Sequence, residues 1–324
     1  MELISPLIEA LTFFWFLFRD VCLPIVVLIS IGIILDKKYN LDLATLVKLN
    51  IHIFVPGFIF VKVVESSTRE TELQGTSVVF FTLSVIAATF VIGFLITVWQ
   101  NWEPSKSRSF FLSTMFYNCG NWGIPMMALA YPENGASIHI YALLTMNLST
   151  FTIGMFLASG YGSKKPFAEI VLGLFKLTPV YAISLGIICI KFQIPVADWK
   201  YIWAPLQYID RGLVSIALVT LGVQLSKTSP PKVDKFIGLA LLLRLVVGPL
   251  IALGLTVLWK LPHSIAAILI LGAGAPTAVN TALLAHDLKA DSRYAAAVVF
   301  YSTCIAIFTV TAILTIQRLF VTPE

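Results

Sequence analysis

Long apolar stretches separated by short polar segments occupy almost the whole of this 324-residue chain. A helix needs about 20 apolar residues to cross the hydrocarbon core of a bilayer, so each stretch predicts one membrane span, and about ten spans fit. The predicted spans are Val21–Leu35, Leu43–Val63, Gly75–Trp99, Ser107–Ala130, Ser137–Ala158, Ala168–Ile190, Ala204–Leu225, Lys235–Trp259, His263–Ala285 and Tyr294–Gln317. Met1 to Phe18 lacks a basic start, so we expect an interfacial lead-in rather than a signal peptide. The pattern predicts one all-α polytopic membrane domain over residues 1–324.

Two of these spans contain a run of residues that interrupts a helix. Amides, glycines and a proline fill Asn118–Pro125 in the fourth span, and Gly272–Asn280 interrupts the ninth span in the same way. Proline removes a backbone donor, and glycine lets the chain leave helical geometry. In hydrocarbon such a break survives only where it is buried in protein or lines a cavity. Broken spans in corresponding positions are typical of the binding site of a secondary transporter.

Short motifs recur in the same order in the two halves of the chain. The matched pairs are Leu23–Ile34 with Thr178–Ile188, Gly93–Trp99 with Gly254–Trp259, and Gly123–Pro125 with Gly274–Pro276. Five spans per half is an odd number, so the second copy must be inserted upside down. We therefore predict two inverted five-helix repeats, residues 1–159 and 160–324, in which the broken helices four and nine cross.

Composition narrows the class of protein. Hydrophobic residues make up 58% of the chain and charged residues only 12%, against about 25% charged in soluble domains. The net charge of +5 comes from basic residues in the predicted loops, which favours membrane orientation over nucleic-acid binding. Lysine and arginine are more frequent in the loops after odd-numbered spans. This asymmetry predicts that those loops are cytoplasmic and that both termini lie outside.

The chain lacks the motifs of catalysis and of ATP-driven transport. It has no Walker A loop, no GxSxG elbow and no HExxH pair, so we expect no enzyme activity. The cysteines form no CxxC pair and are predicted to be structural; they are Cys22, Cys119, Cys189 and Cys304. We expect no cofactor and no structural metal. A sodium site formed by backbone carbonyls and by Asn and Thr side-chain oxygens is consistent with the sequence, although nothing in the sequence requires one.

Polar groups at the two breaks are the candidates for substrate contact. If the breaks cross, the N-termini of the second half-helices carry partial positive charge and can hold a carboxylate without a buried lysine. The predicted substrate-binding residues are Asn118, Asn121, Pro125, Pro276, Thr277, Asn280 and Arg211. The alternative for the amides and the threonine is that they only satisfy the broken backbone or bridge helices.

Charged residues within spans are few. Arg244 lies well inside the eighth span, where an ionisable side chain is either functional or a structural group that holds helix carbonyls. Asp210 and Arg211, near the start of the seventh span, form either a snorkelling boundary pair or an entrance that attracts anions. No pair of aspartates, a common device for proton coupling, stands at either break.

The sequence resembles the auxin efflux carrier family, which includes bacterial permeases and the plant PIN-type auxin carriers. The segments that carry the resemblance are Leu23–Gly32, Asn118–Pro125, Leu221–Gly222, Arg244–Pro249, Ala275–Asn280 and Ala295–Phe300. The resemblance implies ten spans in two inverted repeats, with a scaffold of spans one, two, six and seven. It also implies a transport domain that holds the crossed spans and moves like an elevator, and a homodimer.

The resemblance also implies roles for single residues. Asn118 takes the position of an asparagine that contacts substrate in the PIN-type carriers. In the seventh span those carriers have an asparagine where this chain has Asp210 or Arg211, so auxin itself is not implied. Their long cytoplasmic loop is replaced here by Gly160–Pro166. The chain therefore looks like the prokaryotic type, a multi-pass protein of the inner (plasma) membrane.

Three functions are consistent with the sequence. The first is a carrier of small organic anions, auxin-like or other carboxylates, whose partners are the substrate and the lipid bilayer. The second is a sodium-coupled organic-anion symporter of the bile-acid type. The third is a membrane sensor that binds a ligand without moving it.

Overall fold

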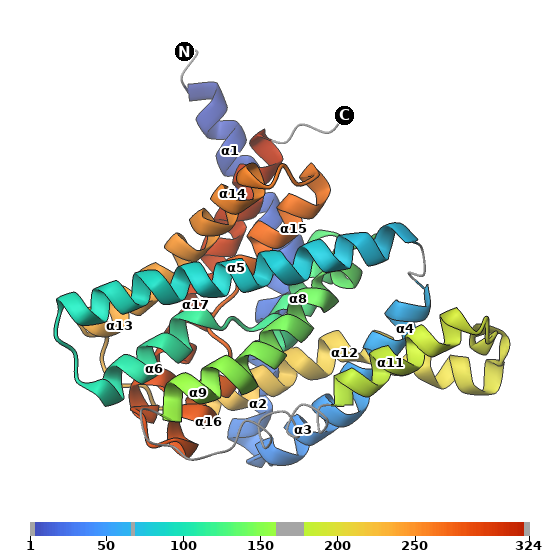
Figure 1. The fold of residues 1–324 in the computed structure, drawn as a ribbon, viewed down its shortest axis with the longest axis horizontal. Helices are drawn as coiled ribbons and strands as arrows, with labels where there is room; N and C mark the ends of the chain where they lie inside the picture. The colour runs from blue at the N-terminus through green and yellow to red at the C-terminus, as the bar shows by residue number, and fades with distance from the viewer. Residues whose placement is uncertain (1–3, 66–68, 160–177, 321–324) are drawn as a thin grey trace.

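A computed structural model describes residues 4–65, 69–159 and 178–320 of the chain. The fold in these ranges is helical (Figure 1), and the β-type pairing in them is an isolated bridge between Tyr117 and Thr277. Seven helical stretches of the described chain are long and apolar enough to cross a membrane: Leu11–Tyr39, Leu43–Glu65, Gly75–Trp99, Gly135–Leu157, Lys200–Lys227, Lys235–Leu258 and Ser292–Leu319. They correspond to the predicted spans one, two, three, five, seven, eight and ten. The chain is thus an all-α, multi-pass integral membrane protein.

The other three predicted spans differ from these seven for identifiable reasons. The fourth is divided into α6 (Pro104–Met115) and a second part made of η3 (Cys119–Gly123) and α7 (Ile124–Ala130). The ninth is divided into α15 (His263–Ala273) and α16 (Asn280–Asp287). The sixth is described from α11 (Thr178–Lys191) onward, and residues 160–177, which include the predicted loop Gly160–Pro166, lie outside the described ranges. The count of ten spans and the inverted repeat stay predictions.

The first span begins earlier than the sequence predicted. Helix α1 (Ile4–Leu17) continues through η1 (Phe18–Cys22) into α2 (Leu23–Tyr39), so the membrane-length stretch starts at Leu11 rather than at Val21. Phe18 stacks on Phe308 of α17 (Ser292–Phe320), with ring centroids 6.2 Å apart. The segment from Leu11 on therefore belongs to the span and is not an interfacial lead-in.

The second span is made of α3 (Leu43–Leu49), η2 (Asn50–Phe54) and α4 (Val55–Glu65). Asp42 caps its start, because the carboxylate accepts hydrogen bonds from the backbone of Ala44 and Thr45. The hydroxyl and the amide of Thr45 bond to the charged form of this exposed carboxyl, and they hold its pKa below the ordinary value. This cap fixes where the helix begins and hence which residues fall in η2.

Most of the wide π-helical turns in the described chain stand just before a proline. A proline cannot donate to the carbonyl four residues earlier and pushes against it, and a turn with one extra residue relieves that conflict. In four cases the carbonyl four residues before the proline lies in the π-turn itself: Pro24 follows η1, Pro56 follows η2, Pro125 follows η3, and Pro249 follows η6 (Leu243–Val247). A fifth π-helix, η4 (Thr150–Gly154), has no such proline. Three of these turns position the polar residues Asn50, Asn121 and Arg244.

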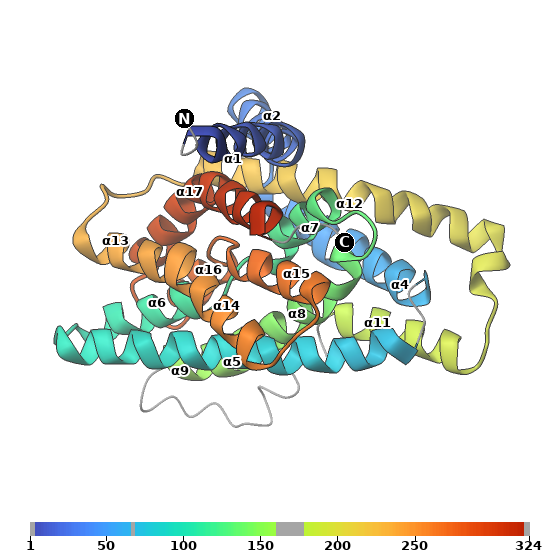
Figure 2. The ribbon, with the colours of Figure 1, turned by 90° about the horizontal axis from the view of Figure 1, so that it is seen from above.

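The helices form two groups that pack against each other (Figures 1 and 2). We call the first the α12 group: α2 and the second span pack on α12 (Lys200–Lys227), and α11 packs on α4 of the second span. Helix α12 follows the short 3-10 helix η5 (Val196–Asp198). Helices α2 and α12 touch backbone to backbone: a Cβ on Gly222 would meet the carbonyl oxygen of Ile29, and one on Gly32 that of Val219. These are the spans that the family resemblance assigns to the scaffold.

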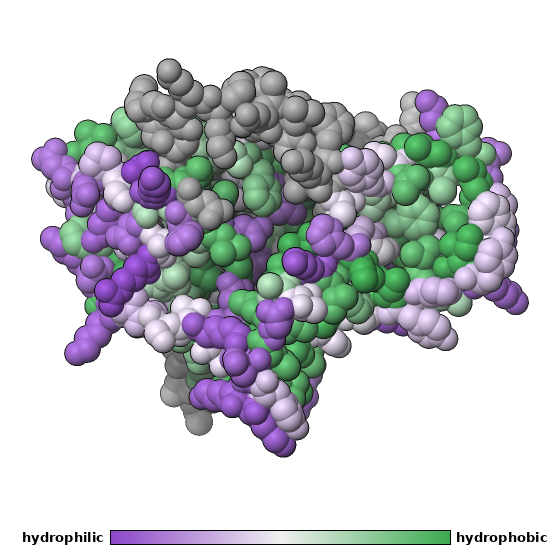
Figure 3. Space-filling model, turned by 90° about the horizontal axis from the view of Figure 1, so that it is seen from below, coloured by the Kyte–Doolittle hydropathy of each residue, from purple (hydrophilic) through white to green (hydrophobic). Residues whose placement is uncertain are grey.

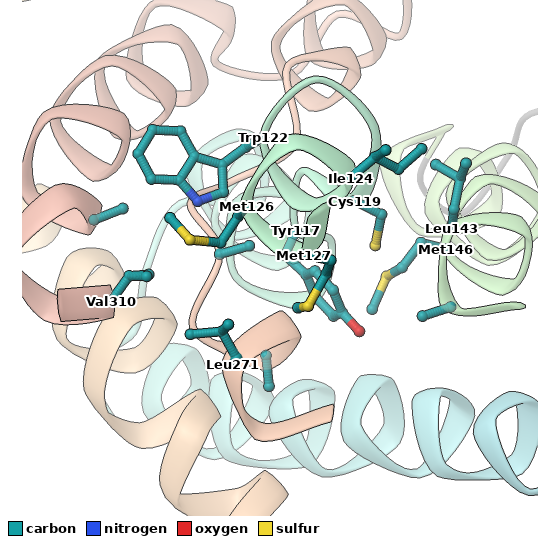
Figure 4. Close-up of a cluster of buried hydrophobic side chains, with 14 of the residues drawn as sticks. Tyr117, Cys119, Trp122, Ile124, Met126, Met127, Leu143, Met146, Leu271 and Val310 are labelled. Atoms are coloured by element: carbon teal, nitrogen blue, oxygen red, sulfur yellow. The ribbon is translucent and has the colours of Figure 1, made fainter. Parts of the chain in front are cut away.

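The second group, here the crossing group, holds both broken spans. It also contains α5 (Arg69–Trp99), α8 (Gly135–Ser149), η4, α9 (Met155–Ser159), α13 (Lys235–Leu242), α14 (Gly248–Leu258) and α17. Helix α5 runs along one side of this group and packs on α6, α8 and α14. Buried apolar side chains from α8, α15 and α17 pack around those of α7 in the second half of the fourth span (Figure 4); those labelled include Ile124, Met127, Leu143, Leu271 and Val310.

The outer surface is apolar over broad areas. Figure 3 shows these areas on one face of the molecule, with hydrophilic residues gathered toward its left and lower edges. Large apolar side chains point outward from the span-forming helices, among them Phe80, Leu95 and Val257. In water such patches would drive association, whereas in a membrane they contact lipid.

Candidate functional site

The two breaks meet at the centre of the crossing group. Tyr117 and Thr277 form an antiparallel β-bridge. The backbone N–H of Asn118 donates to the carbonyl oxygen of Pro276 at 2.8 Å, and that of Ala278 donates to Phe116 at 2.9 Å. Each interrupted backbone therefore satisfies part of the other. The predicted crossing of spans four and nine is present.

Arg244 joins the ends of the first half-helices. Its side chain is fully buried, with 0% of its surface exposed. Nη1 donates to the carbonyl oxygen of Thr114, at the end of α6, over 3.0 Å, and Nη2 donates to that of Ala273, the last residue of α15. The guanidinium lies over the ring of Tyr117, 5.0 Å from its centroid. Arg244 thus holds the carbonyls at the ends of both first half-helices.

This arrangement gives the crossing an uneven distribution of charge. The C-terminal ends of α6 and α15 carry partial negative charge, which the guanidinium of Arg244 compensates. The second half-helices begin at the crossing, after Asn118 and Val279, and neither residue caps its helix through the side chain. Their N-terminal N–H groups keep partial positive charge. The crossing is therefore suited to a small anion.

Asn118 presents a free donor at this place. Its side chain is only 6% exposed, and Nδ2 has no hydrogen-bond partner among the described residues. The backbone of the same residue is fully used, since its N–H donates to Pro276 and its carbonyl accepts from Gly123. A buried donor without a partner is costly, so a ligand that accepts from it gains the missing bond.

Asn121 is paired with a residue that the sequence analysis did not single out. Its Oδ1 accepts a hydrogen bond of 2.7 Å from Nδ2 of Asn50, on η2 of the α12 group. Asn50 is 2% exposed, and its own Oδ1 has no partner among the described residues. The signal in the sequence was a lone amide inside an apolar span, six residues before Pro56.

The predicted residues of the ninth span have different environments. The Thr277 hydroxyl donates to the carbonyl oxygen of Ser113 at 2.7 Å, and its backbone N–H donates to the Ser302 hydroxyl at 3.0 Å. Thr277 thus holds the crossing together. Asn280 is half-buried and makes no side-chain hydrogen bond within the described chain. Pro276 is buried and offers its carbonyl to Asn118.

Two other residues complete the comparison with the sequence prediction. Pro125 is buried in the first turn of α7, after the π-turn that carries Asn121. Arg211 is exposed on α12 and has no bond to the crossing in the described part of the chain, while the neighbouring Asp210 forms an ion pair of 3.4 Å with Lys62. The structure therefore brings the predicted residues of both breaks together and leaves Arg211 outside their network.

His139 of α8 fills the space between the two breaks. A Cβ on Gly123 would contact its Nε2, and a Cβ on Gly272 would lie 3.2 Å from its Nδ1. The imidazole is fully buried. The two glycines thus admit a ring that packs on both broken spans, and the sequence analysis gave His139 no such role. Among the described residues, no three His, Cys, Asp or Glu side chains gather as a metal site.

Comparison with known sequences decides the family. The profile of a family described as membrane transport protein matches residues 20–173 and again residues 167–314. The chain belongs to this family. The match confirms the resemblance to the auxin efflux carriers. One relative of this membrane transport protein, an uncharacterized transporter of the archaeon Methanothermobacter thermautotrophicus, is 23% identical over 295 residues, which cover 89% of this chain and 94% of the relative.

Membership of the membrane transport protein family indicates transport rather than catalysis as the activity. It also agrees with the membrane-spanning helices of the structure. In such a protein the crossing of two broken helices is the expected place for the transported molecule.

Proposed function

We propose that this membrane transport protein is a secondary carrier of small organic anions, with the substrate carboxylate bound at the crossing. The observation that supports this most is the position of Arg244 between Thr114 and Ala273. The guanidinium of Arg244 neutralises the partial negative charge at the C-terminal ends of α6 and α15. The N-terminal ends of the second half-helices therefore attract an anion without a positive side chain in the binding site. Such a site can release its substrate, since no full ion pair has to be broken.

In this proposal the substrate completes the bonds that the crossing leaves open. The carboxylate accepts from Nδ2 of Asn118 and from backbone N–H groups in the first turn of η3 other than that of Cys119, which donates to Tyr117. Asn280, at the start of α16, orients the substrate from the other broken span. Thr277 and Pro276 keep the two breaks together and do not touch the substrate through a side-chain donor.

We also propose alternating access by movement of the crossing group relative to the α12 group. Arg244 joins spans four, eight and nine, so these must move as one body. The close backbone contact between α2 and α12 makes the other group equally rigid. A carrier built from two rigid groups can transfer a site that belongs to one of them.

Asn118→Ala tests the site directly. One lost hydrogen bond to a charged ligand costs about 1–3 kcal/mol, so we expect the dissociation constant for the carboxylate to rise about 5- to 150-fold. The measurement is ligand-induced thermal stabilisation and counterflow in proteoliposomes, with indole-3-acetate, malate and short aliphatic acids as probes. Asn134→Ala is the matched control, because Asn134 is an exposed N-cap of α8 whose side chain makes no capping hydrogen bond. Unchanged affinity in Asn118→Ala, with substrate bound by the wild type, would place the site elsewhere.

Replacement of sodium by potassium separates the carrier from the sodium-coupled symporter. We expect equal uptake in the two salts, because the charges fixed at the crossing balance the anion without a bound cation. The measurement is initial uptake into proteoliposomes at constant ionic strength and zero membrane potential. Uptake that stops in potassium would favour the symporter, and ligand binding without counterflow in either salt would favour a sensor.

A further inference from the structure

A hydrogen bond between two asparagines joins the two helix groups beside the proposed substrate site. Nδ2 of Asn50, in the α12 group, donates to Oδ1 of Asn121, in the crossing group, at 2.7 Å. Both residues lie in π-turns, η2 and η3, that precede a proline. A π-turn shifts the following side chains around the helix, so each amide is directed by its own backbone irregularity rather than by general packing.

Two amide atoms on either side of this bond are left without a partner. Oδ1 of Asn50 is an acceptor and Nδ2 of Asn118 is a donor; both residues are more than nine-tenths buried, and neither atom has a partner in the described chain. Asn118 is the N-cap of the half-helix η3, three residues before Asn121, which holds Asn50. An apolar residue of the same size at position 50 would avoid the cost of an unpaired acceptor. The amide is therefore best explained by a ligand that donates to it.

We propose that Asn50 is a specificity-determining residue whose free Oδ1 accepts a hydrogen bond from a donor that the substrate carries next to its carboxylate. The preferred substrates are then hydroxy acids or N–H-bearing acids rather than plain carboxylic acids. Asn118 binds the carboxylate, and Asn50 accepts a hydrogen bond from the hydroxyl or N–H group. Asn121 holds the amide of Asn50 in the orientation that exposes Oδ1. This rests on the proposed function, since it needs an anion at the crossing.

The physical basis of the selectivity is asymmetric. A site built to bond a hydroxyl discriminates against the analogue that lacks it, because the buried acceptor is left unpaired when the analogue binds. At about 1–3 kcal/mol for that acceptor, the expected preference is about 5- to 150-fold. The matched pairs lactate with propionate, and malate with succinate, differ only in the hydroxyl group.

The experiment measures the dissociation constants of both pairs for the purified full-length protein. We expect the wild type to bind the hydroxy acid about 5- to 150-fold more tightly. In Asn50→Leu this ratio should fall close to one, through weaker binding of the hydroxy acid alone. His52→Ala, an exposed change in the same π-turn, should leave the ratio at its wild-type value.

A second variant keeps the test decisive if Asn50→Leu is poorly folded. Asn50→Asp loses the Nδ2 donor, but the amide of Asn121 can turn and donate to the carboxylate, which still offers its second oxygen to the substrate. The added negative charge lies beside the anion, so both members of a pair should bind more weakly while their ratio is kept. A wild type that binds hydroxy and plain acids equally, a ratio that survives in Asn50→Leu, or unchanged anion affinity in Asn50→Asp would each overturn the proposal. If the wild type binds none of the four acids, the proposed anion carrier itself fails.

Discussion

Arg244→Met should abolish transport and lower the stability of the protein more than any other single change at the crossing. Methionine matches the bulk of the side chain but donates no hydrogen bond, so the carbonyls of Thr114 and Ala273 lose their buried partner. At about 1–3 kcal/mol for each unpaired carbonyl, the cost is about 2–6 kcal/mol. The uncompensated helix ends would also repel an anion. The measurements are the thermal unfolding midpoint in detergent and counterflow of the best substrate.

Two further substitutions separate the hydrogen bonds of Arg244 from its charge. Arg244→Gln can still donate to one carbonyl but removes the cation, so we expect partial recovery of stability with anion affinity still lost. Arg244→Lys keeps the charge but not the forked geometry that reaches both helix ends, so anion affinity should exceed that of Arg244→Gln. Equal anion affinity in all three variants would contradict an electrostatic role for Arg244.

Gly222→Ala should separate α2 from α12 and prevent formation of a stable α12 group. The added Cβ would meet the carbonyl oxygen of Ile29 and lie 3.0 Å from Cα of Gly32. Both neighbours are backbone atoms, so no side-chain rotation relieves the clash. Overpacking of a buried contact costs about 1–3 kcal/mol and more where the backbone must shift, so we expect a loss at or above the upper end. The measurement is thermal unfolding and the monodisperse yield after purification.

The matched control for Gly222 is Gly254→Ala. Gly254 lies inside α14, and nothing stands within 4 Å of the position that its Cβ would take. Alanine is favoured over glycine inside a helix by about 0.5–1 kcal/mol, so this variant should be at least as stable as the wild type. Similar unfolding midpoints for the two alanine variants would show that α2 and α12 do not depend on close backbone contact.

The breaks and their crossing were predictable because their causes are local in the sequence. Gly, Pro and Asn residues clustered inside apolar spans at Asn118–Pro125 and Gly272–Asn280, and a broken backbone in hydrocarbon has few ways to satisfy its polar groups. The position of Arg244 deep in a span was evident too, although its partners were not. The apolar helix of the first span starts ten residues before Val21, because the apolar residues from Leu11 on continue the helix without a break.

The contacts between segments far apart in the chain could not be predicted from the sequence. Asn50 and Asn121 are 71 residues apart, and only the packing of η2 against the crossing group brings their side chains together. The fit of His139 against Gly123 and Gly272 likewise depends on three separate helices. The sequence left substrate contact and satisfaction of the broken backbone as alternatives for Thr277; in the structure its hydroxyl donates to the carbonyl oxygen of Ser113. A sequence shows that a polar residue is buried but not which way it points.

The bridging position of Arg244 also has a consequence for how the chain is made. When the eighth span enters the membrane from the ribosome, the fourth span with Thr114 precedes it there, whereas the ninth span with Ala273 still follows. Insertion of an arginine near a helix centre costs about 2.5–3.5 kcal/mol, which the apolar stretch Lys235–Leu258 offsets. Arg244 can therefore join α6 first and offer its second donor to α15 as that helix arrives. We therefore expect the crossing to assemble in chain order, with Arg244 inserted first and the broken ninth span binding to it afterwards.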